Sequence, residues 1–250
     1  MIRIGFRLAL AYRSNILITC VTLVAQVFLL RMIWTSVYGA RPAAGLPLEA
    51  LLAYLTLANL QAFATHTIVV STAHHRIRVG TVFFDLARPV GYLRQLASFQ
   101  VGNTLGGLCL LAPVVPVVLL VGSITAPADG PGYLLTLVLG YVIAVELALL
   151  ISLAGFWMTE TSAVALFHRL VSQFFAGTMV PLTYFPGFLG VLAEALPFKY
   201  LGYVPAAVYV GQISDVSGAV AIAVAWVVGL AGLLVLTWSR ARRRVVIQGG

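Results

Sequence analysis

The sequence has few charged residues and few cysteines, and this scarcity already limits the kind of protein it can be. Only 9% of its 250 residues are charged, whereas 61% are hydrophobic, and the mean hydropathy is +1.03. A water-soluble globule of this size cannot cover its surface with so few polar side chains. The composition therefore excludes a soluble domain and indicates a protein whose main solvent is the lipid bilayer.

Several motifs of soluble enzymes are missing as well. The sequence contains no G-x-x-x-x-G-K-[ST] phosphate loop, and its only lysine is Lys199, so we predict that the chain does not bind ATP in the usual way. It contains no G-x-S-x-G nucleophile motif, which argues against a serine hydrolase. These absences predict a chain that is not an enzyme, has no catalytic residues and binds no cofactor itself.

The patterns needed for metal and nucleic-acid binding are also weak. His74 and His75 are adjacent and point in different directions on a helix, without cysteines or paired carboxylates nearby, so we predict no metal site. The net charge of +8 comes mainly from arginines beside apolar runs, where anionic lipid is the expected partner rather than nucleic acid. The two cysteines, Cys20 and Cys109, fall inside such runs and are expected to be free thiols.

Six apolar runs are long enough to cross a membrane. A hydrocarbon core about 30 Å thick requires roughly 20 apolar residues per helix. We expect an all-α membrane protein with a single domain, residues 1–250, and six transmembrane helices at 15–37, 48–71, 96–122, 133–157, 164–185 and 217–238. The third run is long enough to kink at Pro113 and Pro116, and Pro181 cuts the fifth run short.

Positive residues are distributed unevenly between the two sides of this topology. Cytoplasmic loops of membrane proteins are enriched in Lys and Arg. With a cytoplasmic N-terminus, only Arg31, Arg41 and Lys199 of the 15 positive residues fall in or beyond the outer half. Both termini are therefore predicted to be cytoplasmic, in a multi-pass protein of the inner membrane. The inner set is Arg3, Arg7, Arg13, Arg76, Arg78, Arg88, Arg94, Arg169, Arg240, Arg242, Arg243 and Arg244.

Three segments outside the spans have patterns of their own. In residues 1–14, Arg3 and Arg7 share one helical face while apolar residues recur on another, which predicts an interfacial helix on the inner leaflet. Residues 72–95 mix cations with an apolar centre and predict a short amphipathic cytoplasmic helix. Residues 181–216 are apolar but interrupted by Pro and Gly, so we expect short re-entrant helices on the outer side.

Polar side chains at membrane depth are the best candidates for a functional path, because they are costly in lipid and usually face protein or water. Asn59 and His66 are seven residues apart and share one face of the second span. The alternative is that such residues only hydrogen-bond to neighbouring helices. Arg31 and Glu146 have opposite charges, but a rise of 1.5 Å per residue puts them roughly 10 Å apart in depth, which disfavours a pair.

The chain resembles the membrane subunit of ABC-2-type exporters. Residues 76–92, RIRVGTVFFDLARPVGY, are similar to the R-I-x-x-G-x-x-x-x-x-L-x-R-P loop of a bacterial ABC-2 branch that works as a pair of permeases. Residues 181–211, PLTYFPGFLGVLAEALPFKYLGYVPAAVYVG, resemble the outer signature of that branch, in which F-P is followed by L-P-F and then by P with a closing G. The likeness extends over essentially the whole chain.

This resemblance implies a permease that pairs with itself or with a sister permease and docks two cytoplasmic ATPase subunits, which bind ATP and Mg²⁺. Closure of the ATPases would switch access from the inner to the outer side of a bacterial inner membrane. By position, the coupling helix that contacts the ATPase would consist of Phe83, Phe84, Asp85, Leu86 and Arg88. The translocation path would lie at the dimer seam, lined by Gln26, Asn59, His66, Gln173 and Thr178.

The resemblance also implies a substrate class, namely amphiphilic small molecules such as drugs or secondary metabolites, with lipid-linked glycans as an alternative cargo. A different hypothesis is a membrane-embedded enzyme acting on lipid or a polyprenyl carrier, which needs acidic residues or histidines clustered at one membrane face. Only Glu160 with His168 comes close to that pattern. A non-transporting assembly factor is a third possibility, and it would need no surface for an ATPase.

Overall fold

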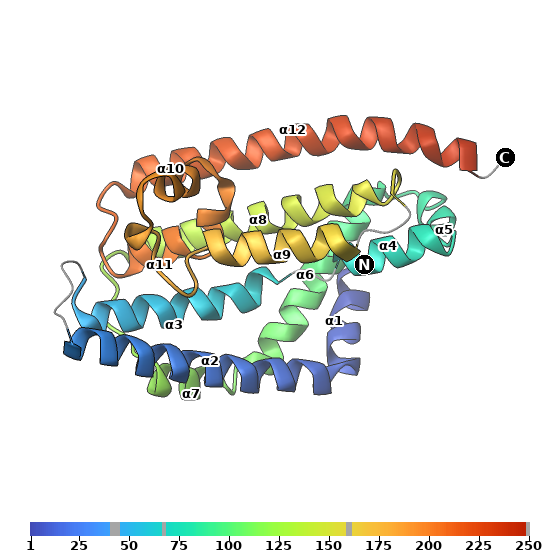
Figure 1. Cartoon of the computed structure of the whole chain (residues 1–250). Coiled ribbons are helices and arrows are strands. Elements are labelled where there is room, and N and C mark those ends of the chain that lie inside the picture. Colours follow the sequence, from blue (N-terminus) through green and yellow to red (C-terminus); the bar gives the residue numbers. More distant parts are fainter. Residues whose placement is uncertain (41–45, 67–68, 159–161, 249–250) are drawn as a thin grey trace.

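The chain folds as a bundle of helices in the computed structural model, which describes residues 1–40, 46–66, 69–158 and 162–248 and contains no β-strand within these ranges. The all-α fold class is thereby confirmed. Most of the longer helices run side by side, whereas the N-terminal helix and the helix that begins at Tyr92 cross their direction (Figure 1). In chain order the elements are α1 (Ile2–Ala11), α2 (Arg13–Ala40), α3 (Leu48–Thr65), α4 (Val69–Arg78), α5 (Val82–Leu86), α6 (Tyr92–Leu111), α7 (Val115–Val121), α8 (Gly130–Ala154), α9 (Ser162–Phe175), η1 (Leu182–Tyr184), α10 (Gly187–Ala195), η2 (Pro197–Leu201), α11 (Tyr203–Tyr209) and α12 (Val216–Gln248).

Three described helices, α2, α8 and α12, are each long and apolar enough to cross a membrane. A fourth candidate is α6 together with α7, which are bent by 64° at the break between them. Pro113 lies in that break, and Pro116 lies in the first turn of α7, where a helix has no need of the missing N–H. The structure thus supports three or four spans by length and composition, and the six-span topology remains a prediction.

Two helices are shorter than the spans predicted for them. Helix α3 ends at Thr65, where the hydroxyl donates to the Gln61 carbonyl at 3.1 Å and His66 is extended. Its predicted span continued to residue 71, but α4 is a separate helix, and residues 67–68 lie outside the described ranges. Helix α9 has 14 residues and ends just before Gly177, whose φ is +70°. Hydropathy does not register such local stops, which explains the difference.

The N-terminal helix α1 packs closely against α6 through glycines. A Cβ atom on Gly102 would lie 2.0 Å from the carbonyl oxygen of Ile2, and one on Gly5 would lie 2.1 Å from that of Phe99. Such distances leave no room for any other residue, and small residues allow close helix pairs of this kind in membranes. The helix expected within residues 1–14 is therefore present with both its arginines exposed. Its position on the inner leaflet remains a prediction.

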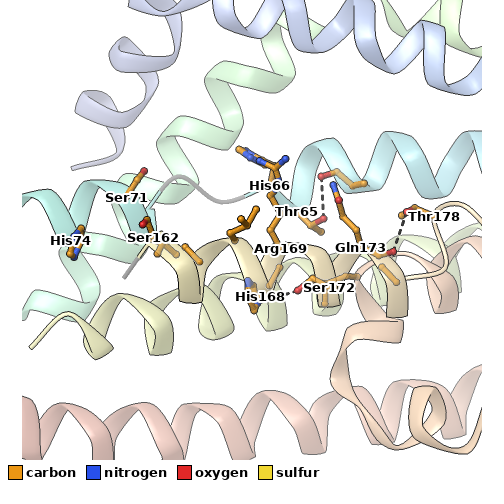
Figure 2. A pocket seen from close by; sticks show the side chains of 17 residues that line it. Thr65, His66, Ser71, His74, Ser162, His168, Arg169, Ser172, Gln173 and Thr178 are labelled. Carbon is orange, nitrogen blue, oxygen red and sulfur yellow. Dashed lines mark hydrogen bonds between the residues drawn. The ribbon is translucent and has the colours of Figure 1, made fainter. Parts of the chain in front are cut away.

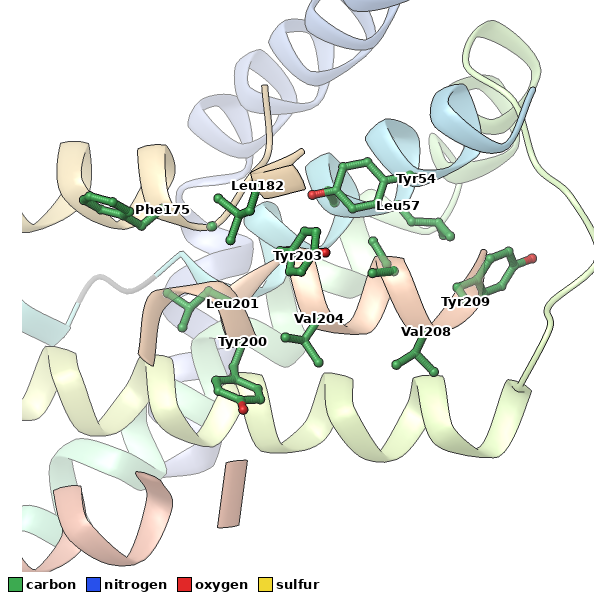
Figure 3. Close-up of a cluster of buried hydrophobic side chains, with 14 of the residues drawn as sticks. Tyr54, Leu57, Phe175, Leu182, Tyr200, Leu201, Tyr203, Val204, Val208 and Tyr209 are labelled. Carbon is green, nitrogen blue, oxygen red and sulfur yellow. The ribbon is translucent and has the colours of Figure 1, made fainter. Parts of the chain in front are cut away.

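The largest buried core lies where α11 packs between α3 and α8 (Figure 3). Tyr54 of α3 is fully buried, donates its hydroxyl to the Gly177 carbonyl at 2.8 Å, and packs edge-on against Tyr203 with the ring centroids 6.1 Å apart. The Tyr200 carbonyl approaches α8 at Gly140, where a Cβ atom would lie only 2.0 Å away. The Pro- and Gly-rich segment before α12 is thus folded against the bundle, so that protein covers much of its backbone.

The two ends of the bundle differ in charge. Helices α4 and α5 and the C-terminal end of α12, with its exposed arginines, lie at one end (Figure 1). Carboxylates begin helices at the other end: Asp129 accepts a hydrogen bond from the Gly132 N–H at 2.8 Å, and Asp215 accepts one from the Gly218 N–H at 2.9 Å. That backbone bond, with a second from the Ser217 hydroxyl, lowers the pKa of Asp215. The charge asymmetry read from the sequence is thus also an asymmetry between the two ends of the fold.

Candidate docking surface and transport cavity

The segment predicted to dock an ATPase folds as a helical hairpin of α4 and α5. Gly80, with a φ of +78°, lies in the connection between the two helices. Asp85 Oδ2 accepts a hydrogen bond from Arg76 Nη1 at 2.7 Å, and Asp85 Oδ1 lies 3.5 Å from Arg88 Nη1. The Asp85 side chain is only 5% exposed, so its charge is compensated inside the hairpin. The pair with Arg76 holds α5 against α4, and the pair with Arg88 joins Asp85 to the residues just after α5.

The hairpin is also fixed to the start of α6. The buried side chain of Gln95 donates from Nε2 to the carbonyl oxygens of Asp85 and Val90, both at 2.7 Å. Val82 is buried and Leu86 is half-buried in a hydrophobic cluster that also contains residues of α4, α6 and α8. The hairpin is therefore a supported unit of the fold rather than a free loop.

Two aromatic rings project from this supported hairpin. Phe83 is 67% exposed and Phe84 is 69% exposed, and their rings are T-shaped with centroids 6.3 Å apart. Arg88, four residues after Phe84, is exposed as well. Exposed aromatic rings with charged neighbours are typical anchors of protein interfaces. Of the five residues predicted to dock an ATPase, the structure places Phe83, Phe84 and Arg88 on the surface, while Asp85 and Leu86 face the interior.

A cavity of about 430 Å³ lies between α3, α4 and α9 (Figure 2). This volume is within the range of small-molecule sites. Its polar lining includes His66, His168, Arg169, Ser172, Gln173 and Thr178. Its apolar lining includes Ala62, Ala144, Ala165, Leu166, Ala176 and Leu201. The cavity thus combines a row of polar groups, mostly from α9, with walls of small apolar side chains.

Three of the five residues predicted to line a path, His66, Gln173 and Thr178, do line this cavity. Asn59 is buried and is not among the lining residues. Its Nδ2 donates to the Thr178 carbonyl and to the Leu55 carbonyl, both at 2.8 Å. Asn59 therefore braces the segment after α9, which corresponds to the alternative that the sequence left open for it.

Gln26 lies in a different hollow, a groove of about 550 Å³ along α2 that Met179 and Val180 complete. Apart from Gln26 and Thr22, the groove is lined by apolar side chains of α2 and of this short segment. The structure therefore does not bring Gln26 together with the other residues predicted for the path.

Sequence reasoning missed Arg169 as a lining residue and used it only as a marker of topology. No carboxylate of the described residues forms an ion pair with its guanidinium. His168, one residue earlier, places Nε2 3.2 Å from the Ser172 hydroxyl. A usable signal was present, because Arg169 and Gln173 are four residues apart and share one face of α9.

The pair considered for a membrane-embedded enzyme, Glu160 with His168, is not tested by the described residues. Within them, no group of three or more His, Cys, Asp or Glu side chains is arranged to hold a metal ion. Glu160, the acidic residue considered for that alternative, lies outside the described ranges.

Three long apolar helices, with the bent pair α6–α7 as a fourth candidate span, define the class of the protein, a multi-pass helical membrane protein. The sequence model of the family described as "ABC-2 family transporter protein" matches residues 15–249. The chain therefore belongs to the ABC-2 transporter family, as a membrane component of a transporter, and membership implies association with an ABC ATPase subunit. A search of curated proteins and a search of solved structures each find no match.

Proposed function

We propose that this chain is the permease subunit of an ATP-binding cassette exporter in a bacterial inner membrane, with six spans and cytoplasmic termini. It moves amphiphilic small molecules outward by alternating access, and separate ATPase subunits supply the energy by hydrolysing ATP with Mg²⁺. A second permease, either another copy or a sister chain, completes the conduit. The observation that carries this proposal is the pair of exposed rings, Phe83 and Phe84, on a hairpin braced from within by Asp85.

The hairpin suits a protein partner better than lipid alone. Its two exposed rings belong to the same short unit as Arg76 and Arg88, so apolar anchors are combined with charged groups in one hairpin. Burial of one Phe side chain contributes roughly 1.5–3 kcal/mol, so two rings supply a large share of a specific contact. A helix that only rests on lipid has no need of a buried carboxylate to fix the angle between α4 and α5.

The same hairpin connects the docking surface to the cavity. Asp85 ties α5 to α4 through Arg76, and α4 packs against α8 and α9. Ser71 and His74 of α4 line the cavity. When closing ATPases displace α5, α4 moves with it, and one wall of the cavity shifts relative to α9. Packed elements that move as rigid bodies transmit such switches, and ATP drives them by binding the two states with different affinity.

The exposed face of α2 suits the second permease. Leu29, Ile33 and Val37 are between 45% and 58% exposed, and they line the groove that contains Gln26. An amide within an apolar helix face offers one hydrogen bond to a partner helix, and polar groups of this kind contribute to association in membranes. This assignment keeps Gln26 at the dimer seam, whereas His66, Gln173 and Thr178 serve the cavity within one subunit.

The test is affinity purification of the tagged chain from its native membranes, followed by mass spectrometry and an ATP hydrolysis assay. We expect a Walker-motif ATPase to co-purify with the wild-type chain. The double variant Phe83→Ala, Phe84→Ala should recover at least about tenfold less of it, because two apolar anchors are removed. The matched control is Phe188→Ala on α10, whose ring is 76% exposed and which lies far from the hairpin (Figure 1). Equal ATPase recovery with the double variant and with the control would overturn the docking assignment.

A further inference from the structure

The cavity between α3, α4 and α9 contains one fixed positive charge. Among its described lining residues, Arg169 is the only Arg or Lys, and none is Asp or Glu. The other polar lining residues are Ser, Thr and Gln, which are neutral, and His, whose only charged form is positive. The local field in this part of the bundle therefore favours an anion over a cation.

Arg169 is free to hold such an anion. Its guanidinium forms no ion pair with a described carboxylate. A guanidinium presents a planar set of N–H donors that matches a carboxylate or a phosphate. His66, at the end of α3, and Arg169, on α9, both lie in the central part of the cavity (Figure 2). Gln173, one turn further along α9, adds an amide donor.

The rest of the lining suits an apolar group of moderate size. Ala62 of α3, Ala165 and Ala176 on either side of Arg169, and Leu201 of η2 supply small or flexible apolar walls. A space of about 430 Å³ is large enough for a head group together with part of a chain or ring system. A free inorganic anion would leave these apolar walls without a function.

We infer that this cavity binds amphiphiles whose head group is an anion, a carboxylate or a phosphate, with Arg169 at the head group and the alanine-rich walls at the apolar part. The inference rests on the proposed transport function and specifies the charge class of its substrate. The same head-group chemistry occurs in exported solutes and in anionic phospholipids, so the test separates these two sources.

The test measures binding of two matched fluorescent probes to the purified complex in phosphatidylcholine nanodiscs, with empty nanodiscs as the background. The probes are 11-(dansylamino)undecanoic acid and the corresponding amine, N-dansyl-undecane-1,11-diamine. Because a charge-assisted bond to Arg169 is available only to the acid, the wild type should bind the acid at least about tenfold more tightly. Arg169→Gln should remove this preference, whereas Arg169→Lys should retain most of it. The matched control is Arg7→Gln, which removes an exposed arginine of α1 outside the cavity.

Several outcomes would overturn the inference. These are equal binding of acid and amine to the wild type, an equal loss of both probes in Arg169→Gln, or displacement of the acid by inorganic phosphate at a similar concentration. Binding of the acid by Arg169→Lys and an unchanged elution volume show that the cavity is still folded. Nanodiscs that also contain phosphatidylglycerol identify the source of the anion. If phosphatidylglycerol weakens binding of the acid probe, the ligand is a phospholipid; if binding of the acid probe is unchanged, the ligand is a solute.

The proposed function fails in a different way. It fails if no ATPase associates with the chain and if neither probe crosses the membrane into the lumen of inside-out vesicles when ATP is added. The present inference fails alone if ATP-dependent transport occurs but Arg169→Gln does not change the preference for acid over amine. The two failures therefore give separate results in the same set of preparations.

Discussion

Arg31 of α2 donates from Nη1 to the Val121 carbonyl at 2.7 Å and to the Gly122 carbonyl at 3.2 Å. Helix α7 ends at Val121, so these carbonyl groups have no partner within a helix. The arginine thus holds the broken pair α6–α7 against α2 and satisfies backbone groups that lipid cannot satisfy. Its partner is the end of a helix rather than Glu146, as the difference in depth along their helices already suggested.

Replacement of Arg31 by Leu should destabilise the protein. The substitution leaves the carbonyl groups at the end of α7 without a donor, and hydrogen bonds to charged groups contribute roughly 1.5–3 kcal/mol each. Arg31→Lys should lose less stability than Arg31→Leu, because an ammonium group still reaches one carbonyl. Thermal unfolding in detergent measures both variants, with Arg94→Leu as a control for loss of an exposed arginine. A melting temperature of Arg31→Leu equal to that of the control would contradict the role given to Arg31.

The close approach of α1 to α6 predicts an unusual response to Gly→Ala substitution. At an unconstrained helix position this change stabilises by up to about 1 kcal/mol. Gly229 of α12 has no atom within 4 Å of an added Cβ, so Gly229→Ala should be neutral or stabilising. Gly102→Ala places the Cβ 2.0 Å from the Ile2 carbonyl oxygen and should be destabilising. Urea or thermal unfolding should show a loss of stability in Gly102→Ala but not in Gly229→Ala if α1 packs as described, and no such difference between the two variants if it does not.

The fold could be predicted from the sequence where apolar composition and helix-breaking prolines determine it. Apolar runs of about 20 residues locate α2, α8 and α12, and Pro113 marks the break between α6 and α7. The early end of α3 at Thr65 was not predicted, because apolar residues lie on both sides of it and hydropathy does not locate the point where His66 leaves the helix. The packing of α1 against α6 depends on Gly5 meeting a distant helix, which no local pattern reveals.

Asn59 shows why the site was harder to predict than the fold. A polar residue in an apolar helix indicates a functional path and a helix-to-helix hydrogen bond equally well. Only the fold shows that Asn59 reaches the Thr178 carbonyl, while His66, two turns away, lines the cavity. Arg169 was hidden for the opposite reason, since an arginine near a predicted cytoplasmic end is explained fully by topology.

Asn59→Leu should therefore act on stability rather than on substrate preference. It removes a buried hydrogen bond between α3 and the segment after α9, and such bonds between helices in membranes contribute roughly 0.6–2 kcal/mol. We expect a lower melting temperature but an unchanged ratio of acid to amine binding. Asn103→Leu, a half-buried amide of α6, is the control for loss of an amide in a membrane helix. A changed acid-to-amine ratio in Asn59→Leu would instead return Asn59 to the lining of the path.

The buried carboxylate of Asp85 gives the sharpest test of how the docking surface is built. Asp85→Asn removes its ion pairs with Arg76 and Arg88, and breaking a fully buried pair costs about 3–5 kcal/mol. Because the Arg76 side chain is 33% exposed, solvent screening reduces this cost, and we expect roughly 1–3 kcal/mol of local destabilisation. The variant should expose the hairpin to protease and lower ATPase recovery, although Asp85 itself does not reach the surface. Glu194→Gln, which removes a 61% exposed carboxylate paired with Lys199, is the matched control.

Exchange of the two charges, Arg76→Asp with Asp85→Arg, separates support of the hairpin from direct contact with the ATPase. If Asp85 acts only by holding α5 on α4, the double variant restores part of the protease resistance and part of the ATPase recovery together. The restoration is incomplete, because Arg88 lies 3.5 Å from the carboxylate of residue 85 and would repel an arginine there. Protease resistance that returns without any recovery of the ATPase would show that the carboxylate contacts the partner directly, in which case the interior role assigned to Asp85 is wrong.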